Sequence, residues 1–322
     1  MHNINLTEKL TKIIIGIIFF FGLSPILLAA APDSYTKMST IAPKFNLKYS
    51  RYKEYHVYRN KYSQIALQPD KRQAYFNGVL LLQNNAPDMR WKRLHLSNLD
   101  YYKTFFPLLA PHLVPRQKVY RILIDPGHGG KDRGAAGAKL KEKDYTLKLS
   151  MRVAAILHAC GYKVYLTRTK DKYIPLLSRV YLQKLSRSDL FISIHCNAAK
   201  NKNVYGIETY ALTPQYAKST NDTGKGNKKR NNSNRFDSNN MLLAYYLQRS
   251  MLLRTKALDR GVKRARFAVL KDINAPGALL EVGFLSNTKE ENNLANPAYM
   301  EKLARGIADG ILTYHQLVAP KE

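Results

Sequence analysis

Two histidines follow apolar stretches that are typical of buried strands. His128 lies in Ile122–Gly134, ILIDPGHGGKDRG, where an apolar run ends in a turn rich in glycine. His195 follows the apolar run Leu190–Ile194. Because ligand sites of α/β sheets lie at the carboxyl ends of the strands, we expect both imidazoles at that edge. For His128 taken alone, an incidental histidine in a capped loop is an equal alternative.

Two glutamates belong to the same hypothesis. Glu142 lies in Gly137–Asp144, GAKLKEKD, which leads into a predicted helix, and Glu281 ends the apolar run Ala278–Leu280. Burial of an unpaired carboxylate is costly, so a glutamate in such a stretch needs a partner or a function. We expect all four side chains to converge on one rim of the sheet. The alternative, two core histidines and two surface glutamates, requires each to reach that rim by chance.

This set of side chains matches the chemistry of a hydrolytic metal site. Two imidazoles and one carboxylate are a recurrent ligand set of catalytic zinc, with a fourth position left to water. Zinc lowers the pKa of that water to roughly 7. A second carboxylate outside the ligand set can accept the proton of the water and return it to a leaving amine. The sequence offers one candidate for each of these roles.

Strands alternate with helices from Val119 onward, which predicts an α/β fold. We expect a mixed, mostly parallel central sheet with helices on both faces. The predicted strands are Tyr120–Ile124, Lys163–Thr167, Leu190–His195 and Ile207–Leu212, with further apolar pieces at Phe267–Leu270 and Ala278–Val282. The predicted helices are Asp144–Ala159, Leu176–Ser186, an amphipathic helix at Met241–Leu258, and a terminal helix near Tyr299–Leu317.

Two other regions have a different composition. Residues 32–117 are rich in Tyr, Lys and Arg, and we expect either a small N-terminal α/β module or a partly disordered arm, of uncertain role. Thr213–Asn240 holds few apolar residues and includes Lys225–Arg230, KGNKKR. Such a composition predicts a mobile, basic polar insertion.

The amino-terminal segment predicts export. Lys9 and Lys12 precede the uncharged run Ile13–Ala31, which ends in three alanines. This pattern is typical of a signal peptide over residues 1–31, or of an uncleaved membrane anchor. We therefore expect a protein of the periplasm or cell envelope. The two cysteines, Cys160 and Cys196, are expected at opposite edges of the sheet, so no disulfide is predicted.

The charge of the chain is strongly positive. It has 52 Lys and Arg against 23 Asp and Glu, a formal net charge of +29. An exported protein meets little nucleic acid, and the basic residues form no recognition helix or stacking platform, so we expect no nucleic-acid partner. Anionic envelope polymers or a membrane surface are better candidates for contact with the basic residues.

Five blocks of the sequence follow one another in a recognisable order. They are IDPGHGGKDRGA from Ile124, LKEKDYTLKLS from Leu140, LTRTKDKYIPLLSR from Leu166, DLFISIHCNA from Asp189 and LLEVGFLSN from Leu279. In this order they closely resemble the zinc-dependent N-acetylmuramoyl-L-alanine amidases of bacterial wall turnover, the amidase type 3 family. The resemblance extends from about Val119 to the end and implies a catalytic zinc amidase domain at 118–322, with the basic insertion at 213–240.

The resemblance assigns roles to the four side chains. It implies that His128, Glu142 and His195 bind zinc and that Glu281 is the catalytic acid and base. The implied reaction is hydrolysis of the amide between the lactyl group of N-acetylmuramic acid and L-alanine of the peptidoglycan stem peptide. In the family this activity serves wall remodelling and separation of daughter cells, often under control of an activator protein.

Departures from the family pattern leave some alternatives open. Cys196 stands where the family usually has a small residue, and we expect a buried spectator that points away from His195. The insertion is expected to be a disordered or partner-folded cover of the site, or an arm that grips anionic glycan or lipid. A zinc-dependent carboxypeptidase is the nearest enzymatic rival, alone or as a second activity. A serine peptidase based on Ser50 and Lys53 lacks convincing companion motifs, and a non-enzymatic wall-binding protein is disfavoured because all four residues are present.

Overall fold

The computed structural model describes residues 34–222 and 226–320. The predicted signal peptide, residues 1–31, lies outside the described residues. Within the described ranges, no helix has both the length and the apolar character needed to cross a membrane.

One long sheet organises the molecule. Among the described residues it has eleven strands in the order β10-β9-β11-β14-β12-β13-β6-β5-β4-β3-β2. Its larger half runs parallel except where β12 pairs antiparallel with β14. This confirms the predicted mixed, mostly parallel sheet. The strands of this half are β9 (Arg121–Pro126), β10 (Lys163–Leu166), β11 (Leu190–Asn197), β12 (Ile207–Leu212), β13 (Asp259–Ala265) and β14 (Gly277–Phe284).

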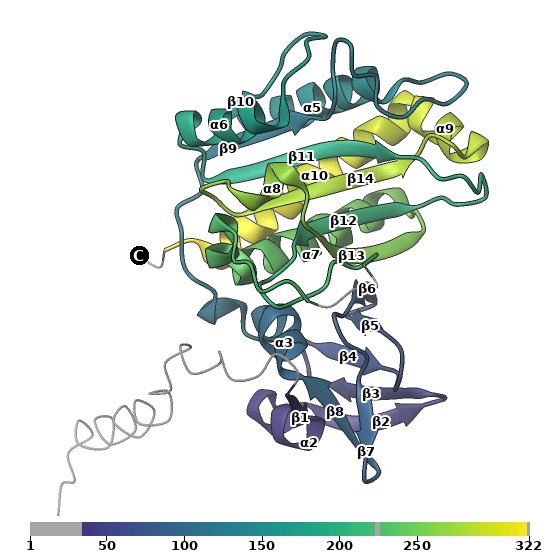
Figure 1. The fold of residues 1–322 in the computed structure, drawn as a ribbon, viewed down its shortest axis with the longest axis vertical. Coiled ribbons are helices and arrows are strands. Elements are labelled where there is room, and N and C mark those ends of the chain that lie inside the picture. The colour runs from purple at the N-terminus through teal and green to yellow at the C-terminus, as the bar shows by residue number, and fades with distance from the viewer. Residues whose placement is uncertain (1–33, 223–225, 321–322) are drawn as a thin grey trace, which may run out of the picture.

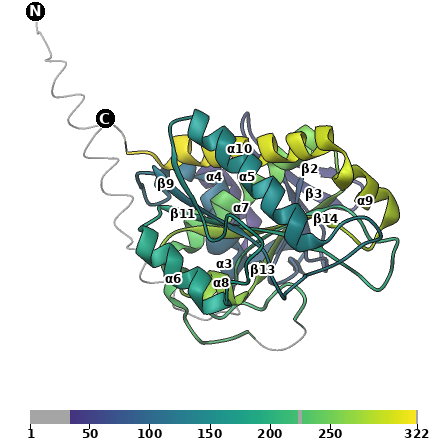
Figure 2. The same ribbon diagram turned by 90° about the horizontal axis from the view of Figure 1, so that it is seen from above.

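Helices cover both faces of this half, as Figure 2 shows. One face carries α5 (Glu142–Ala159), α7 (Asp237–Thr255) and α10 (Pro297–Val318), and the other carries α6 (Leu176–Ser186) and α8 (Ala268–Lys271). The helix α9 (Thr288–Ala295) follows β14. Alternate strand residues supply two hydrophobic cores, with Ile122 and Ile192 on the first face and Leu123 and Phe191 on the second.

The amino-terminal region is a small α/β module, the first of the two predicted alternatives. Its strands β2 to β6 form an antiparallel meander, and β1, β8 and β7 form a separate sheet. The strands are β1 (Tyr35–Lys37), β2 (Lys48–Tyr52), β3 (Tyr55–Arg59), β4 (Gln64–Leu67), β5 (Gln73–Phe76), β6 (Val79–Leu82), β7 (Asp88–Arg90) and β8 (Arg93–Ser97). The helical pieces are α2 (Met38–Ile41), η2 (Ala42–Phe45), α3 (Asn98–Asp100), η3 (Tyr101–Phe105), α4 (Phe106–Leu109) and η4 (Pro111–Leu113).

The module joins the larger half edge to edge, below β13 in Figure 1. Leu81 of β6 pairs in parallel with Val262 of β13. The backbone N–H of Leu80 also donates to Asp259 Oδ2 at 2.7 Å. The meander is therefore a continuation of the central sheet.

The prediction of a mobile loop over Thr213–Asn240 is wrong for the end of that segment, from Asn231 onward. Residues 232–236 form a 3₁₀ helix, η5 (Asn232–Phe236), and α7 begins at Asp237, four residues before its predicted start. The polar side chains are buried because they satisfy one another and the backbone: Asn231 and Asn234 form a capping box, and Ser233 Oγ donates to the carbonyl of Ile273 at 2.9 Å. Residues 223–225, inside the basic run, lie outside the described residues.

Other elements differ from the prediction in smaller ways. The helix α7 is buried around most of its circumference rather than amphipathic, because it packs between the sheet and α10. Its close approach to α10 requires glycine, since a Cβ at Gly310 would lie 2.8 Å from Leu247 Cα. The strand β13 and the helix α9 were not predicted, and the apolar piece Phe267–Leu270 is largely helical as α8.

Candidate metal centre and active site

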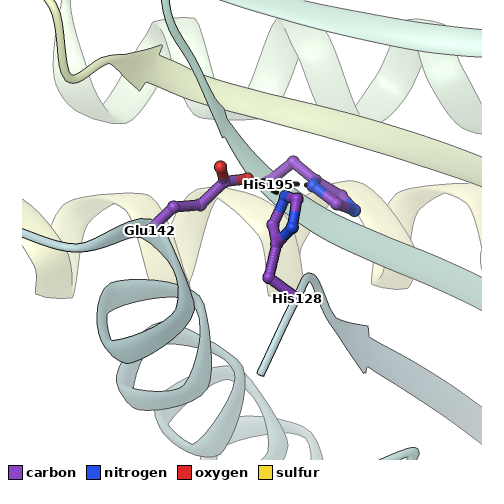
Figure 3. Close-up of side chains that lie close together, drawn as sticks. All are labelled: His128, Glu142 and His195. Carbon is purple, nitrogen blue, oxygen red and sulfur yellow. Dashed lines mark hydrogen bonds and ion pairs between the residues drawn. The ribbon is translucent and has the colours of Figure 1, made fainter. Parts of the chain in front are cut away.

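The structure brings three of the four predicted site residues to one point. His128 follows β9, Glu142 is the first residue of α5, and His195 lies near the end of β11. One ligand atom from each side chain lies within 4.8 Å of the others. Figure 3 shows the two imidazoles and the carboxylate facing a common centre.

Glu142 is the hub of this cluster. Its Oε1 lies 2.9 Å from His195 Nδ1 and 3.1 Å from His128 Nε2. Backbone groups hold the same carboxylate, since the N–H of Cys196 donates to Oε1 at 3.0 Å and that of Ala135 donates to Oε2 at 2.7 Å. Burial alone would raise the pKa of Glu142, but hydrogen bonds from His128 and His195 lower it to about 2. The carboxylate is therefore a fixed anion.

The donor set fits a divalent transition metal. Ligand atoms of a tetrahedral zinc ion, with bonds of about 2.0–2.1 Å, lie about 3.3 Å apart, close to the distances between Glu142 and the imidazoles. The side chains of His128 and His195 are 24% and 20% exposed, whereas that of Glu142 is 3% exposed. A metal held by these atoms would be anchored from the protein side and reachable from solvent.

Two glycines leave the space that this arrangement needs. A Cβ at Gly134, where φ is +64°, would lie 2.5 Å from Glu142 Oε2 and 2.6 Å from His128 Cδ2. A Cβ at Gly127 would lie 2.6 Å from His195 Nδ1. His128 itself has a φ of +60°, which is strained for a residue with a side chain. The glycine-rich turn is therefore a steric requirement of the cluster.

Buried arginines fasten the backbone that carries His128. Arg179 donates to the carbonyls of Pro126 at 2.7 Å and His128 at 2.8 Å, and pairs with Asp125 Oδ1 at 2.6 Å. Arg168 donates to the carbonyl of Gly127 at 2.8 Å. Both arginines lie in the block LTRTKDKYIPLLSR, but no local pattern indicates that they are buried, since arginine is mostly exposed in proteins. They compensate for the strained turn.

A further carboxylate orients His128. Asp132 Oδ2 lies 2.9 Å from His128 Nδ1, on the side of the ring away from Glu142. Carboxylates in this position fix the tautomer of metal-binding histidines. Sequence reasoning missed Asp132, although its place four residues after His128 is a usable signal.

Glu281 lies beside the cluster on the neighbouring strand. It is the register partner of His195 on β11 and of Glu208 on β12, so the three side chains share one face of the sheet. Its Oε2 is buried and has no hydrogen-bond partner among the described residues. Burial first, and then the negative charges of Glu142 and Glu208, raise the pKa of Glu281 well above its ordinary value.

Glu208 is neutralised by its own cations. Its Oε1 lies 2.6 Å from Arg260 Nε and 2.7 Å from Lys263 Nζ, and its Oε2 accepts from the Tyr210 hydroxyl at 2.7 Å. The charge of Glu208 is thus held in a compact network next to Glu281. Sequence reasoning also missed this network, because the strand that supplies Arg260 and Lys263 was not predicted.

Cys196 takes no part in the cluster through its side chain. It is 3% exposed and belongs to the core on the face opposite His195. Both cysteines are free, with Cys160 exposed. These positions agree with the predicted buried spectator.

Comparison with known proteins identifies the family of this chain. A family model described as N-acetylmuramoyl-L-alanine amidase matches residues 122–313, which contain all four site residues. The chain belongs to this amidase family.

Curated amidases show the extent of the similarity. The N-acetylmuramoyl-L-alanine amidase LytC of Bacillus subtilis is 35% identical over 195 residues, 61% of this chain and 35% of that protein. AmiC of Escherichia coli O6:H1 is 32% identical over 228 residues, 63% of this chain and 55% of that protein. The match therefore spans about a third to a half of the length of these two relatives.

Solved amidase structures share the fold of the larger half. An N-acetylmuramoyl-L-alanine amidase from Clostridium difficile 630 is 34% identical with a TM-score of 0.52, covering 62% of this chain and 98% of its own. The catalytic domain of CwlV from Bacillus (Paenibacillus) polymyxa is 31% identical with a TM-score of 0.53, covering 62% and 99%. The similarity is thus to amidase catalytic domains.

Proposed function

We propose that this protein is a zinc-dependent N-acetylmuramoyl-L-alanine amidase. It hydrolyses the amide between the lactyl group of N-acetylmuramic acid and L-alanine of the stem peptide. The observation that carries the proposal is the convergence of His128, Glu142 and His195 on one point, with Glu281 beside them on the next strand. Membership of the amidase family supports the choice of bond.

His128, Glu142 and His195 would hold the zinc ion. When bound, the ion supplies Lewis-acid chemistry, which makes water a competent nucleophile near neutral pH and polarises an amide carbonyl. Asp132 and the arginines behind the turn keep the imidazole of His128 in place. The exposed edges of the two imidazoles leave room for a bulky muropeptide.

Glu281 would move the proton. Hydrolysis forms a C–O bond to the carbonyl carbon and breaks its C–N bond, so one proton must pass from water to the leaving amine. The unpartnered Oε2 can accept that proton and then donate it to the nitrogen. Its raised pKa makes Glu281 a better proton acceptor than an exposed carboxylate, and donation of the same proton to the nitrogen lets the C–N bond break.

Product analysis tests this function. The purified protein, loaded with zinc, is incubated with peptidoglycan, and the soluble products are analysed by mass spectrometry. We expect intact stem peptides with a free L-alanine amino terminus, and no release in the presence of a metal chelator. Release of terminal D-alanine instead would assign a carboxypeptidase, and intact peptidoglycan after zinc loading would refute an amidase.

Location and regulation follow from the same proposal. The apolar segment at residues 13–31 and the wall substrate support export to the periplasm or cell envelope, with anchoring if that segment is uncleaved. Basic residues would add contact with anionic envelope polymers or the membrane surface. Wall remodelling or daughter-cell separation would be the cellular role. A solved structure of a relative, the CwlD amidase from Clostridioides difficile, is in complex with the GerS lipoprotein, which supports a regulatory partner here too.

A further inference from the structure

The antiparallel meander β2 to β6 has one face that belongs to neither hydrophobic core. Alternate residues of its strands, such as Ile65 and Phe76, are buried in the core on the first face. The residues between them point to the opposite face, where a sheet open to water normally carries polar side chains. Here most of them are aromatic or aliphatic, and none of the following is buried or belongs to either core: Tyr52, Tyr55, Val57, Ala66, Tyr75 and Leu80. We name these six side chains the tyrosine face.

The three tyrosines of this face are neighbours. Tyr52 and Tyr55 are register partners on β2 and β3, and the rings of Tyr55 and Tyr75 have centroids 6.0 Å apart at an interplanar angle of 71°. Ala66 pairs with Tyr75 on one side and with Val57 on the other, and its side chain is too short to cover the rings. Tyr52 is 66% exposed at the border of the sheet. Contiguous apolar surface of this kind marks a binding site on a protein.

The tyrosine face lies on the same side of the sheet as the candidate active site. Leu81 and Val262 are register partners, and both are buried in the core on the first face. Side chains alternate along a strand, so Leu80 points to the second face, where Glu281 lies. The geometry at Gly261 agrees, since a Cβ there would lie 2.9 Å from Leu80 Cγ. One face of one sheet thus carries both the candidate catalytic carboxylate and the tyrosines.

The two regions are far apart on that face. From β11, which carries His195, the tyrosines are five to eight strands away, on β5, β3 and β2. At about 4.8 Å per strand, the separation is about 24–38 Å. A four-residue peptide spans at most about 14 Å, so a stem peptide held at the metal site does not reach the tyrosines. A ligand that contacts both regions at once must be a long polymer.

We propose that the tyrosine face binds the glycan strands of the wall. The inference rests on the proposed amidase function, whose substrate is a polymer of N-acetylated sugars. Sugar rings present C–H groups on their flat faces, and the negatively polarised face of a tyrosine ring attracts them. Because the glycan repeats along its length, binding far from the cleaved bond still raises the local concentration of substrate at the active site. The family match begins at residue 122, so this surface lies outside the matched residues.

Equilibrium binding to a neutral sugar polymer tests the proposal. The probe is a soluble oligomer of N-acetylglucosamine, titrated by calorimetry, and its lack of charge removes attraction by the many basic residues of the chain. The variant is Tyr52→Thr/Tyr55→Thr, which introduces β-branched residues suited to strands. Tyr52→Phe/Tyr55→Phe keeps both rings. Tyr120→Thr/Tyr181→Thr removes two exposed tyrosines from the larger half and is the matched control.

We expect the threonine variant to bind the oligomer at least about tenfold more weakly than the wild type. The phenylalanine variant and the control should keep the wild-type affinity, which should not change with added salt. Tyr52→Thr alone, at an exposed position of the edge strand, guards against misfolding and should show a smaller loss. Wild-type affinity in the threonine variant, or an equal loss in the phenylalanine variant, would overturn the proposal. So would a wild-type chain that does not bind the neutral oligomer, whether or not it binds the anionic polysaccharide heparin.

Activity separates this proposal from the proposed function. On intact, insoluble peptidoglycan the threonine variant should lose about tenfold in rate at limiting substrate, because it is no longer held on the polymer. On a soluble N-acetylmuramoyl peptide its rate should equal that of the wild type, which also shows that the variant is folded. An equal loss on both substrates would contradict a role in holding the polymer. If the wild-type chain cleaves neither substrate, the amidase function fails, while binding of the neutral oligomer still decides the tyrosine face.

Discussion

The surroundings of Glu142 and of Glu281 place the same side chain in opposite situations. Both oxygens of Glu142 accept hydrogen bonds, and the two imidazoles lower its pKa to about 2 despite its burial. Glu281, one strand away from His195, has an oxygen with no partner, and burial beside Glu142 and Glu208 raises its pKa. The comparison teaches that neighbours rather than residue type set the charge of a buried carboxylate: the surroundings of Glu142 favour its anion, and those of Glu281 favour its protonated form.

The largest effect is expected at Glu142. Replacing it with Gln removes the anion between the two imidazoles, so zinc content should fall to background and kcat/KM should fall on the order of 10⁴-fold. Zinc is measured by elemental mass spectrometry after dialysis. Asp144→Asn, at an exposed position of the same helical turn, should keep both metal and rate. Full zinc content in Glu142→Gln would remove Glu142 from the ligand set.

The substitution Glu281→Gln should distinguish the proposed role of Glu281 from that of Glu142. It preserves the shape of the side chain but removes its proton affinity, so kcat should fall about 10²–10⁴-fold while zinc content stays at the wild-type level. Both values come from the same preparation. Glu301→Gln, on the far helix α10, serves as the control with the same change of charge. Loss of zinc together with loss of activity would show that Glu281 belongs to the metal site. It would contradict the proposal that Glu142 binds the metal and Glu281 transfers the proton.

The stability of the metal-free protein at acid pH should directly reflect the lowered pKa of Glu142. The pKa of Glu142 is about 2 in the folded chain against 4.5 as its ordinary value, so its stabilisation is complete above pH 4.5 and is lost as pH falls through 2. The group contributes roughly 3 kcal/mol at neutral pH, of which about 2 kcal/mol should be gone at pH 3. Urea unfolding of the wild type and Glu142→Gln at pH 6 and pH 3 gives the difference. A difference independent of pH would contradict the low pKa.

A smaller effect is expected at Arg179, which supports the backbone of the turn that carries His128. In Arg179→Lys an ammonium replaces the planar guanidinium that joins Asp125, Pro126 and His128, so the imidazole should be held less precisely. We expect zinc affinity to fall about tenfold, as for other supporting residues of metal sites. Competition with a chromophoric chelator measures it. Arg187→Lys, just past the end of α6, is the control, and an unchanged affinity in Arg179→Lys would confine Arg179 to a role in stability.

The clustering of His128, Glu142 and His195 could be predicted because its signals are local. His128 and His195 each follow an apolar run that makes a buried strand, and the parallel pairing of β9 with β11 brings the strand ends together. Glu281 stands out because a carboxylate in an apolar run demands a reason. The arginines that support the turn could not be found in this way. Their burial depends on carbonyl groups that only the folded loop presents.

The errors have a common physical cause. The segment at 213–240 and the strand β13 are both rich in polar residues. A prediction from composition places polar side chains in solvent, so it misses polar side chains that are buried. In the structure Asn231 and Asn234 satisfy each other, and Lys263 neutralises Glu208. Such pairing across the chain hides buried elements from any local pattern. For the same reason the sequence did not decide between a folded α/β module and a partly disordered arm for residues 32–117.

Joining the meander to β13 also moves the exposed border of the sheet. Without the module, β13 would present its unpaired backbone groups to other chains, a risk for edge-to-edge aggregation. The border passes instead to β2, whose five residues are all exposed and include Lys48 and Arg51. Short, charged edge strands discourage pairing with a second chain. The module therefore gives the sheet a protected edge.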